Sequence, residues 1–344
     1  GNKFDGNKFI DQAILKGAKV VIYSGSLKKK YNNIIFIKTR NTREKLAEIS
    51  SKYFRKKPKN IIAVTGTNGK SSVSDFFYQI LKLNKINVAS IGTLGIKFKN
   101  KMISVNNTTL DPINLAKYLS FLKKRKINNV ILEASSHGLK QKRLDGLNIS
   151  SAIFTNFSHD HLDYHKNLKD YLNSKLYLFN SLLKKNSTII IDKSLKEFNR
   201  IKNIAKTRGF FLKTFSDKKS NIHLISHEYD GEKQKIKINY KNKFYTFTLN
   251  LVGKTQVKNL FSSILAAENS KIKFKRIIQN INKIKSVDGR FEIVGKLKNG
   301  SLIILDYAHT PDALKTCLID IKEQFSEKKI NIVFGCGGDR DKSK

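Results

Sequence analysis

Short apolar runs alternate along this chain with segments in which apolar residues recur every three or four positions. The runs are typical of buried parallel strands, and the periodic segments are typical of helices with one apolar face. They predict strands at 61–65, 86–91, 129–134, 151–155 and 187–191, and helices at 71–83, 112–125 and 168–184. This alternation predicts an α/β fold with a largely parallel, doubly wound sheet, in which ligands bind at the carboxyl ends of the strands.

The pattern changes on both sides of this unit. The first 57 residues predict a small α/β unit with helices at 9–17 and 43–54 and strands at 18–23 and 34–37. Two runs at 234–240 and 244–251 predict an antiparallel ribbon, which is followed by helices at 255–270 and 274–284. Beyond it the pattern predicts a strand pair at 291–294 and 302–305, a helix at 311–325 and a strand at 330–334. We therefore expect three domains, 1–57, 58–289 and 290–344, of which the first and last are incomplete.

Composition argues against several classes of protein, namely nucleic-acid-binding, membrane and disulfide-rich proteins. The net charge is +40, but the lysines are spread along the whole chain and no nucleic-acid-binding signature accompanies them, so we expect no nucleic-acid partner. The chain has no apolar run of about 18 residues and its first residues lack a signal-peptide pattern, so we expect no membrane partner. Two cysteines, Cys317 and Cys336, make no disulfide framework or metal cluster, and a cytoplasmic location fits them.

The stretch from Ile61 to Ser72 has the layout of a phosphate-binding loop. A buried strand leads into a turn with Gly66 and Gly69, then Lys70 and Ser71 open a helix. Glycines let backbone N–H groups curl around an anion, and the helix start adds unpaired donors. Lys70 supplies a charge for the outer phosphates, and Ser71 supplies a hydroxyl for Mg²⁺. The glycines are closer together than in the general pattern, so the alternative is an ordinary strand–helix turn with Lys70 in solvent.

Two other strands end in residues that ligate metals or phosphates. Glu133 ends the run 129–134, and a hard carboxylate beside a phosphate loop suits a phosphate-bound metal, although a strand-end Glu is also commonly solvated. The run 155–165 holds three of the seven histidines and two aspartates, which favours a metal or phosphate role over a simple helix-capping turn. Lys175 has apolar neighbours and reads as a surface lysine, and residues 306–314 fit a nucleotide contact and a capped helix start equally well.

Together these segments resemble the Mur ligase family of peptidoglycan synthesis, with a phosphate-loop ATPase sheet at its centre. The resemblance covers essentially the whole chain and rests on TGTNGKSS (65–72), NTT (107–109), EASSHGL (133–139), NFSHDHLDYH (156–165), DGRFE (288–292), DYAHTPDAL (306–314) and 335–342. The chain departs from the family at Ser71, usually Thr, at Leu110, usually Pro, and at 253–256.

The resemblance implies a role for each matching residue. ATP is held by the loop residues Gly66, Thr67, Asn68, Gly69, Lys70, Ser71 and Ser72, with Asn259 at the adenine, Arg290 at the γ-phosphate and Asp306 at the ribose. One Mg²⁺ is bound by Ser71 and Glu133, and a second is served by His161 and by Lys175 converted to a carbamate. The acceptor substrate is held by Asn107, Thr108, Thr109, Ser135, Gln141 and Arg143.

The implied activity is ATP-dependent ligation of an amino acid, meso-diaminopimelate or L-lysine, to UDP-N-acetylmuramoyl-L-alanyl-D-glutamate through an acyl phosphate, by a cytoplasmic monomer. The motif that selects the amino acid in the family lies beyond Lys344. Three alternatives stay open: a folylpolyglutamate synthetase-like ligase of the same superfamily, a basic nucleic-acid-binding ATPase, and a fragment that binds nucleotide without turnover.

Overall fold

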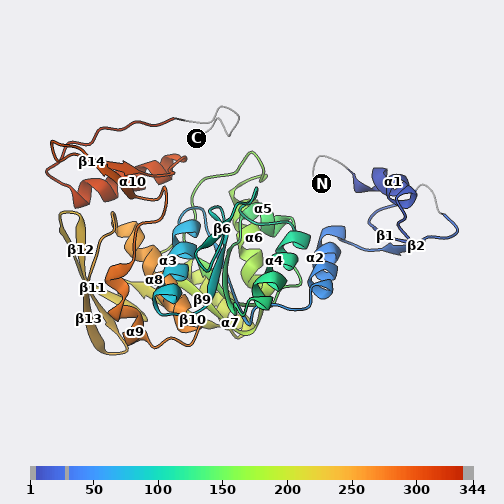
Figure 1. Cartoon of the computed structure of the whole chain (residues 1–344), viewed down its shortest axis with the longest axis horizontal. Helices are drawn as coiled ribbons and strands as arrows, with labels where there is room; N and C mark the ends of the chain where they lie inside the picture. Colours follow the sequence, from blue (N-terminus) through green and yellow to red (C-terminus); the bar gives the residue numbers. More distant parts are fainter. Residues whose placement is uncertain (1–4, 28–30, 336–344) are drawn as a thin grey trace.

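A large mixed sheet is the centre of the molecule. A computed structural model of the chain describes residues 5–27 and 31–335, and within them 11 strands pair in the order β13-β12-β11-β10-β9-β8-β3-β7-β4-β5-β6 (Figure 1). Neighbours from β4 to β11 run parallel, and both flanks are antiparallel. The strands are β3 (Asn60–Thr65), β4 (Val88–Gly92), β5 (Gly95–Phe98), β6 (Lys101–Ile103), β7 (Asn129–Glu133), β8 (Ile149–Phe154), β9 (Leu183–Asp192), β10 (Phe211–Ser216), β11 (Ile222–Asp230), β12 (Lys233–Tyr240) and β13 (Lys243–Leu249).

Helices cover both faces of this sheet because successive side chains of its central strands enter two different cores. Ile62 and Val64 of β3 belong to one core, and Ile61 and Ala63 belong to the other, all at 0–1% exposure. The first core includes α3 (Lys70–Leu83), α8 (Lys254–Glu268), α9 (Phe274–Gln279) and the 3-10 turn η3 (Ile281–Lys283). The second includes α4 (Pro112–Lys124), α6 (Leu168–Tyr177) and α7 (Phe198–Arg208).

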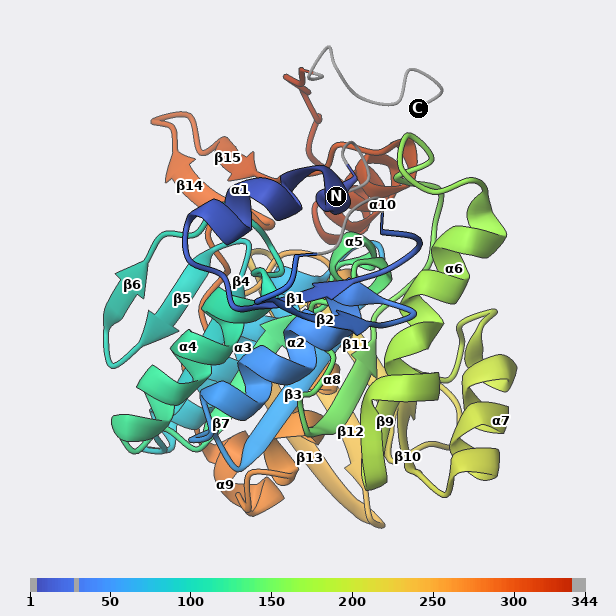
Figure 2. The ribbon, with the colours of Figure 1, turned by 90° about the vertical axis from the view of Figure 1, so that its right-hand side faces the viewer.

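Strand β3 lies at the point where the chain changes direction across the sheet. It pairs with β7 on one side and β8 on the other, and α5 (Ser136–Lys140) joins these two across its carboxyl end. Such a switch point leaves a crevice beyond the carboxyl ends of the strands. Figure 2 shows α10 (Pro311–Gln324) and the β14–β15 pair (Glu292–Lys296, Leu302–Leu305) at the same end of the molecule as α5.

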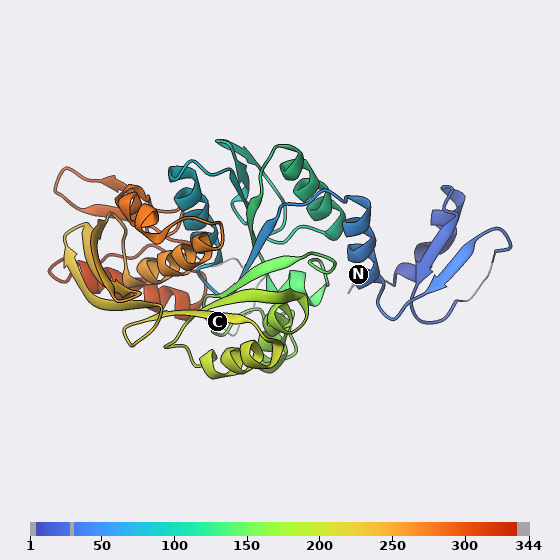
Figure 3. The same ribbon diagram turned by 90° about the horizontal axis from the view of Figure 1, so that it is seen from below.

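The N-terminal residues form a small unit beside the sheet. It contains the 3-10 helix η1 (Gly6–Phe9), α1 (Ile10–Leu15), the parallel pair β1 (Val20–Tyr23) and β2 (Ile35–Lys38), and α2 (Thr42–Tyr53). Figure 3 shows the first four elements set apart, with α2 between them and the central sheet. Helix α2 contacts α4, and the Ser51 hydroxyl donates to the Gly146 carbonyl, which fastens the unit to the sheet. The division of the chain at residues 57 and 289 stays a prediction.

The predicted α/β class and parallel sheet are confirmed, and several details differ. The ribbon of β12 and β13 is part of the central sheet. Strands β10 and β11 pair in parallel beside β9, and β12 follows β11 in the sheet order. The hairpin of β5 and β6 was not predicted. The helix expected at 168–184 is α6 followed by a π-helical turn, η2 (Leu178–Leu182), before β9 begins.

The strand expected at 330–334 is wrong. These residues have no regular secondary structure, and Val333 is fully exposed, because no strand of the described residues lies beside them to pair. Residues 336–344, with Cys336 and the last motif of the resemblance, lie outside the described residues. No helix in the described ranges combines the length and the apolar character that crossing a bilayer requires.

Candidate functional site

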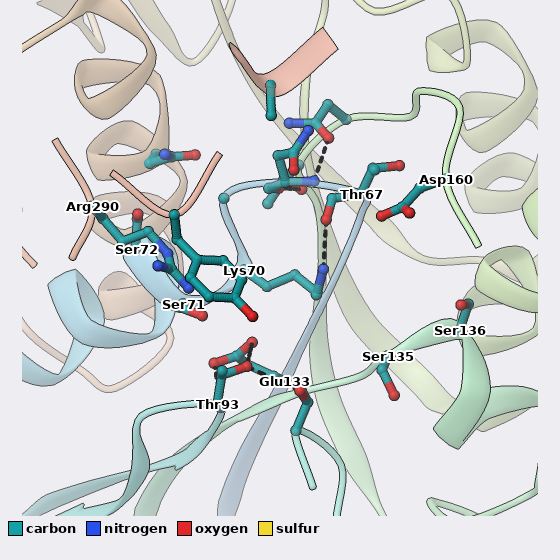
Figure 4. A pocket seen from close by; sticks show the side chains of 18 of the residues that line it. Thr67, Lys70, Ser71, Ser72, Thr93, Glu133, Ser135, Ser136, Asp160 and Arg290 are labelled. Atoms are coloured by element: carbon teal, nitrogen blue, oxygen red, sulfur yellow. Dashed lines mark hydrogen bonds between the residues drawn. The ribbon is translucent and has the colours of Figure 1, made fainter. Parts of the chain in front are cut away.

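A cavity of about 690 Å³ lies at the carboxyl ends of the central strands. Figure 4 shows side chains from β7, α3, α5 and the segment around Arg290 pointing toward it. Its lining includes these residues predicted from sequence: Thr67, Asn68, Gly69, Lys70, Ser71, Ser72, Asn107, Thr108, Thr109, Glu133, Ser135, Gln141, Arg143, His161, Lys175, Asn259, Arg290 and Asp306. Gly66 lies just behind this lining, so the structure gathers the whole predicted set into one place.

The turn after β3 requires glycine at position 66. Its φ is +147°, and a β-carbon there would lie 1.8 Å from the Thr155 hydroxyl oxygen. The neighbouring loop after β8 braces the turn, because the Asn68 N–H donates to the Asn156 side-chain oxygen at 2.8 Å and the Thr67 N–H donates to the Asn156 carbonyl at 3.0 Å. Two loops 90 residues apart in sequence therefore fix one backbone conformation.

Helix α3 begins at this turn with free donors. Its N-cap is Gly69, and no side chain in the described ranges caps the first turn. The first N–H groups of a helix have no intrahelical partners, and the helix dipole makes this end positive. Since Gly69 to Ser72 line the cavity, their backbone is placed to bind a phosphate.

Two lysines, the half-buried Lys70 and the buried Lys175, contact the carbonyl of Gly66. The Nζ of Lys70 donates to the carbonyls of Gly66 and Thr67, at 3.0 and 2.6 Å, and the Nζ of Lys175 donates to the Gly66 carbonyl at 2.7 Å. Lys175 is only 1% exposed and lies over the Tyr171 ring. Burial and the nearby Lys70 hold the pKa of Lys175 well below its usual value, and burial also lowers the pKa of Lys70.

The carboxylate of Glu133 lies at the end of β7, beside the phosphate loop, because β7 pairs with β3. It is 2% exposed, and it accepts the Thr93 N–H at 2.9 Å and the Thr93 hydroxyl at 3.2 Å (Figure 4). The Ser71 hydroxyl is also within its hydrogen-bonding reach. Burial raises the pKa of Glu133, while the Lys70 charge opposes that shift. The pair Ser71 and Glu133 thus presents two oxygens of the kind Mg²⁺ prefers.

A group of aromatic and imidazole rings forms the wall beside Lys175. His161 packs edge-on against the rings of His137 and Tyr171, and the His137 ring stacks on Tyr164. Burial lowers the pKa of His161 to about 4, although the carboxylate of Asp160 opposes this shift. The His161 imidazole is therefore neutral at pH 7, which is the form that ligates metals.

A second wall is a hydrogen-bonded network of Thr109 and residues that follow β7. The Thr109 hydroxyl donates to the Glu133 carbonyl at 2.8 Å and lies 3.0 Å from the Ser135 hydroxyl. The guanidinium of Arg143 donates to the Thr109 carbonyl at 2.5 Å and to the Gln141 side chain at 2.8 Å. These bonds hold an Arg and several neutral donors in fixed positions, an arrangement that suits an anionic, hydroxyl-rich ligand.

The remaining side comes from α8 and the segment after residue 289. A β-carbon at Gly69 would lie 2.6 Å from the Asn259 side-chain oxygen, so Asn259 lies directly on the phosphate loop. Asp306 accepts the N–H groups of Phe291 and Ala308 at 2.9 and 2.8 Å, which fixes the turn that carries Arg290. Arg290 lies over the Tyr307 ring and faces Glu133 and Asp306 electrostatically.

Sequence reasoning missed several residues of the cavity. Thr93, in the turn after β4, carried no chemical signal beyond its place after a strand. Asp160 and His137 lay inside motifs quoted for the resemblance without receiving a role. Asp192 ends β9, so the rule that selected Glu133, a carboxylate at a strand end, would have found it.

A phosphate loop at a topological switch point, with a buried carboxylate and two lysines beside it, defines a nucleotide-binding α/β protein. Residues 64–267 match the Mur ligase middle domain, and residues 289–344 match the Mur ligase glutamate ligase domain. The chain belongs to the Mur ligase family.

Individual relatives agree with this assignment. The UDP-N-acetylmuramoyl-L-alanyl-D-glutamate–2,6-diaminopimelate ligase of Rickettsia montanensis is 36% identical over 349 residues, covering 100% of this chain and 71% of the relative. A solved structure of a ligase with the same name superimposes with a TM-score of 0.80 at 29% identity, over 97% of this chain and 68% of the other. The apo form of L. casei FPGS has a TM-score of 0.66 at 15% identity, over 83% and 76%, and shares the fold alone.

Proposed function

We propose that this protein is an ATP-dependent ligase that adds 2,6-diaminopimelate to UDP-N-acetylmuramoyl-L-alanyl-D-glutamate. The observation that carries the proposal is that the phosphate loop and the network of Thr109, Ser135 and Arg143 face each other across one cavity. The names of the relatives supply the substrates. The cytoplasmic location and the monomeric state predicted from the sequence belong to the same proposal.

ATP fits the cavity along the loop. The uncapped start of α3 and the Nζ of Lys70 bind the phosphates, Asn259 contacts the adenine, and Asp306 contacts the ribose. Arg290 lies close enough to Glu133 for the two charges to interact, which suits a contact with the γ-phosphate beside a metal. Binding ATP here replaces the carbonyl contacts of Lys70 with phosphate contacts.

The residues present also fit Mg²⁺. This ion commonly takes one or two protein oxygens and completes its shell with phosphates and waters. Ser71 and Glu133 match that need. His161 would hold a second Mg²⁺. When bound, the ions neutralise phosphate charge that would otherwise repel the acceptor carboxylate.

Lys175 fits a carbamate because its amine is buried and its pKa is held well below the usual value, which favours the neutral, nucleophilic form. The nitrogen lone pair forms a bond to the carbon of CO₂ and the amine loses a proton, which turns a cation into an anion beside His161. A ¹³C-NMR carbamate signal that appears with ¹³CO₂ in the wild type and is missing in Lys175→Arg would support this. Identical spectra would refute it.

The chemistry then needs two displacements. An oxygen of the D-glutamyl carboxylate, held by Thr108, Thr109, Ser135 and Arg143, attacks the γ-phosphorus of ATP and ADP leaves. The amine of the amino acid attacks the resulting acyl phosphate at its carbonyl carbon, an amide forms, and phosphate leaves after the nitrogen loses a proton. The side chains of this site act by positioning and by charge neutralisation.

A substrate panel tests the function. ADP release should require the UDP-linked dipeptide together with diaminopimelate, and L-lysine should replace diaminopimelate poorly. ADP release that follows folates and glutamate would assign the chain to the alternative ligase class. Stimulation by nucleic acid would assign it to the basic ATPase class, and nucleotide binding without turnover in every mixture would identify a fragment.

A further inference from the structure

One residue outside the predicted set holds the buried carboxylate at both of its oxygens. The Thr93 N–H donates to Oε1 of Glu133 at 2.9 Å, and the Thr93 hydroxyl donates to Oε2 at 3.2 Å (Figure 4). Two donors from one residue fix the plane of the carboxylate as well as its position. Thr93 lines the cavity and lies 40 residues from Glu133 in sequence, so the tertiary fold brings the pair together.

The turn that carries Thr93 is built for this approach. A β-carbon at Gly92 would lie 2.1 Å from Oε1 of Glu133 and 2.5 Å from the carboxyl carbon, so a side chain at position 92 would displace the carboxylate from this position. The turn joins β4 to β5, and β4 pairs directly with β7, the strand that ends at Glu133. Backbone pairing and a missing side chain together set the distance between Thr93 and the carboxylate.

The Thr93 hydroxyl also reaches the acceptor side of the cavity. Its oxygen lies 3.0 Å from the hydroxyl oxygen of Thr108. The one proton of Thr93 is committed to Glu133, so the Thr108 hydroxyl donates to Thr93. The result is a directed chain, Thr108 to Thr93 to Glu133, that links the proposed binding wall for the UDP-linked dipeptide to the proposed Mg²⁺ ligand.

Without the hydrogen bonds from Thr93, the Glu133 carboxylate could pair with the Lys70 ammonium instead. Lys70 is its main electrostatic partner, yet no ion pair within 4.0 Å joins them in the described part of the chain. Lys70 donates instead to Gly66 and Thr67, while Glu133 is held by Thr93 and Ser71. A carboxylate free to turn would be drawn to the lysine and would be lost as a metal ligand.

We propose that Thr93 is a positioning residue that orients Glu133 for Mg²⁺ and transmits occupancy of the acceptor wall to it through Thr108. The proposal rests on the function proposed above, in which Glu133 is a Mg²⁺ ligand. Partners that orient metal ligands typically change metal affinity by about 10- to 100-fold when removed. Loss of the Thr93 hydroxyl should therefore weaken Mg²⁺ binding without unfolding the protein.

The test compares Thr93→Val, which keeps the branched shape and the backbone N–H, with Thr93→Ser, which keeps the hydroxyl. Isothermal titration of ADP at a series of Mg²⁺ concentrations gives the half-saturating Mg²⁺ concentration, which does not require turnover. We expect Thr93→Val to raise it about tenfold, and Thr93→Ser to stay within about twofold of the wild type. Equal values for all three proteins would overturn the proposal.

Glu133→Gln separates this proposal from the function on which it rests. If Glu133→Gln leaves the Mg²⁺ dependence of ADP binding unchanged, the metal assignment itself is wrong. If Glu133→Gln shifts it and Thr93→Val does not, the metal assignment stands and the positioning role is refuted. Unfolding temperatures of all variants, expected within a few degrees of the wild type, identify any variant whose fold has changed.

Thr108→Val tests the directed chain. We expect this variant to weaken binding of the UDP-linked dipeptide and also to raise the half-saturating Mg²⁺ concentration about threefold. In the Thr93→Val background the second effect should vanish, because the link is already broken. Additive effects of the two substitutions on Mg²⁺ would show that Thr108 acts independently and would refute the transmission.

Discussion

Two hollows of similar volume lie at opposite ends of the central strands. The one at the carboxyl ends measures about 690 Å³ and the one at the amino ends about 590 Å³. The first is lined by the half-buried Lys70 and the buried Glu133 and Lys175, whose charges are only partly matched. The second is lined mainly by neutral amides and hydroxyls, with the lysines Lys184 and Lys213, of which Lys213 is paired with Glu268 at 2.9 Å.

The difference lies in how the polar groups are satisfied. At the amino ends, Asn60 donates to Asn129 and Ser270 at 3.1 and 3.0 Å and accepts the Ser150 hydroxyl at 2.5 Å. These groups satisfy one another and need no ligand. At the carboxyl ends, the first turn of α3 keeps free N–H groups, and two lysines depend on the carbonyls of one loop. Volume alone does not identify a site, whereas incompletely matched polar groups do.

The largest predicted effect is the loss of turnover when a charge is removed from the cavity at the carboxyl ends. Lys70→Ala removes the cation that faces the outer phosphates, so ADP release should fall by about 10³-fold, while the free energy of unfolding stays close to the wild-type value. Lys213→Ala is the matched control, since it removes a lysine from the other hollow, and its turnover should stay within about twofold of the wild type. Comparable losses of turnover in both variants would contradict the conclusion that only the cavity at the carboxyl ends takes part in the reaction.

The sequence predicted those features of the two ends that local patterns determine, and it missed those that depend on contacts between distant residues. Apolar runs predicted the central strands, and residues at their carboxyl ends, such as Glu133, were expected to meet at one edge. Lys175 resembled a surface lysine because its neighbours in sequence form a helical stripe, and the stripe cannot show that the other face of the helix is also covered. Its 1% exposure comes from the packing of α6 on the loop after β3.

Thr93 shows a second limit. A threonine after a glycine in a turn has no chemical signal of its own, and its role depends on the approach of that turn to Glu133. The strand expected at 330–334 shows a third, because an apolar run becomes a strand only beside a partner strand. The local sequence pattern therefore predicted the helices, the strands and the edge of the sheet where ligands bind. Contacts between residues distant in sequence could be seen only in the structure.

The buried histidine His165 lies near the cavity, yet its polar atoms have partners within the protein, as those at the amino ends do. Its effect is expected in the pH dependence of the free energy of unfolding. His165 is 1% exposed, contacts the hydroxyls of Ser136 and Ser174, and lies 3.5 Å from Asp170. Burial lowers its pKa to about 4, below the usual value of 6.5. Between these values the unfolded chain binds a proton that the folded chain excludes, so the free energy of unfolding falls as pH falls, by up to about 3 kcal/mol.

Urea unfolding at pH 7, 6, 5 and 4 measures this slope. His165→Gln removes the titrating group, so its unfolding free energy should depend less on pH across this range. His223→Gln, which alters a ring that contacts the Asp217 carbonyl and does not line the cavity, serves as the control and should keep the wild-type slope. Parallel slopes in all three proteins would show that His165 does not exclude the proton.

The smallest predicted effect belongs to the amino end. Asn60→Ala removes the amide that joins β3 to β7 and β8 and leaves Ser150 and Asn129 without a partner they now have. Unsatisfied groups of this kind cost about 1–3 kcal/mol in the free energy of unfolding, and urea unfolding measures the loss. ADP affinity and turnover should stay within about twofold of the wild type, because the altered edge lies at the opposite end of the strands from the phosphate loop. A tenfold loss of ADP affinity with unchanged stability would mean that the amino end takes part in the site.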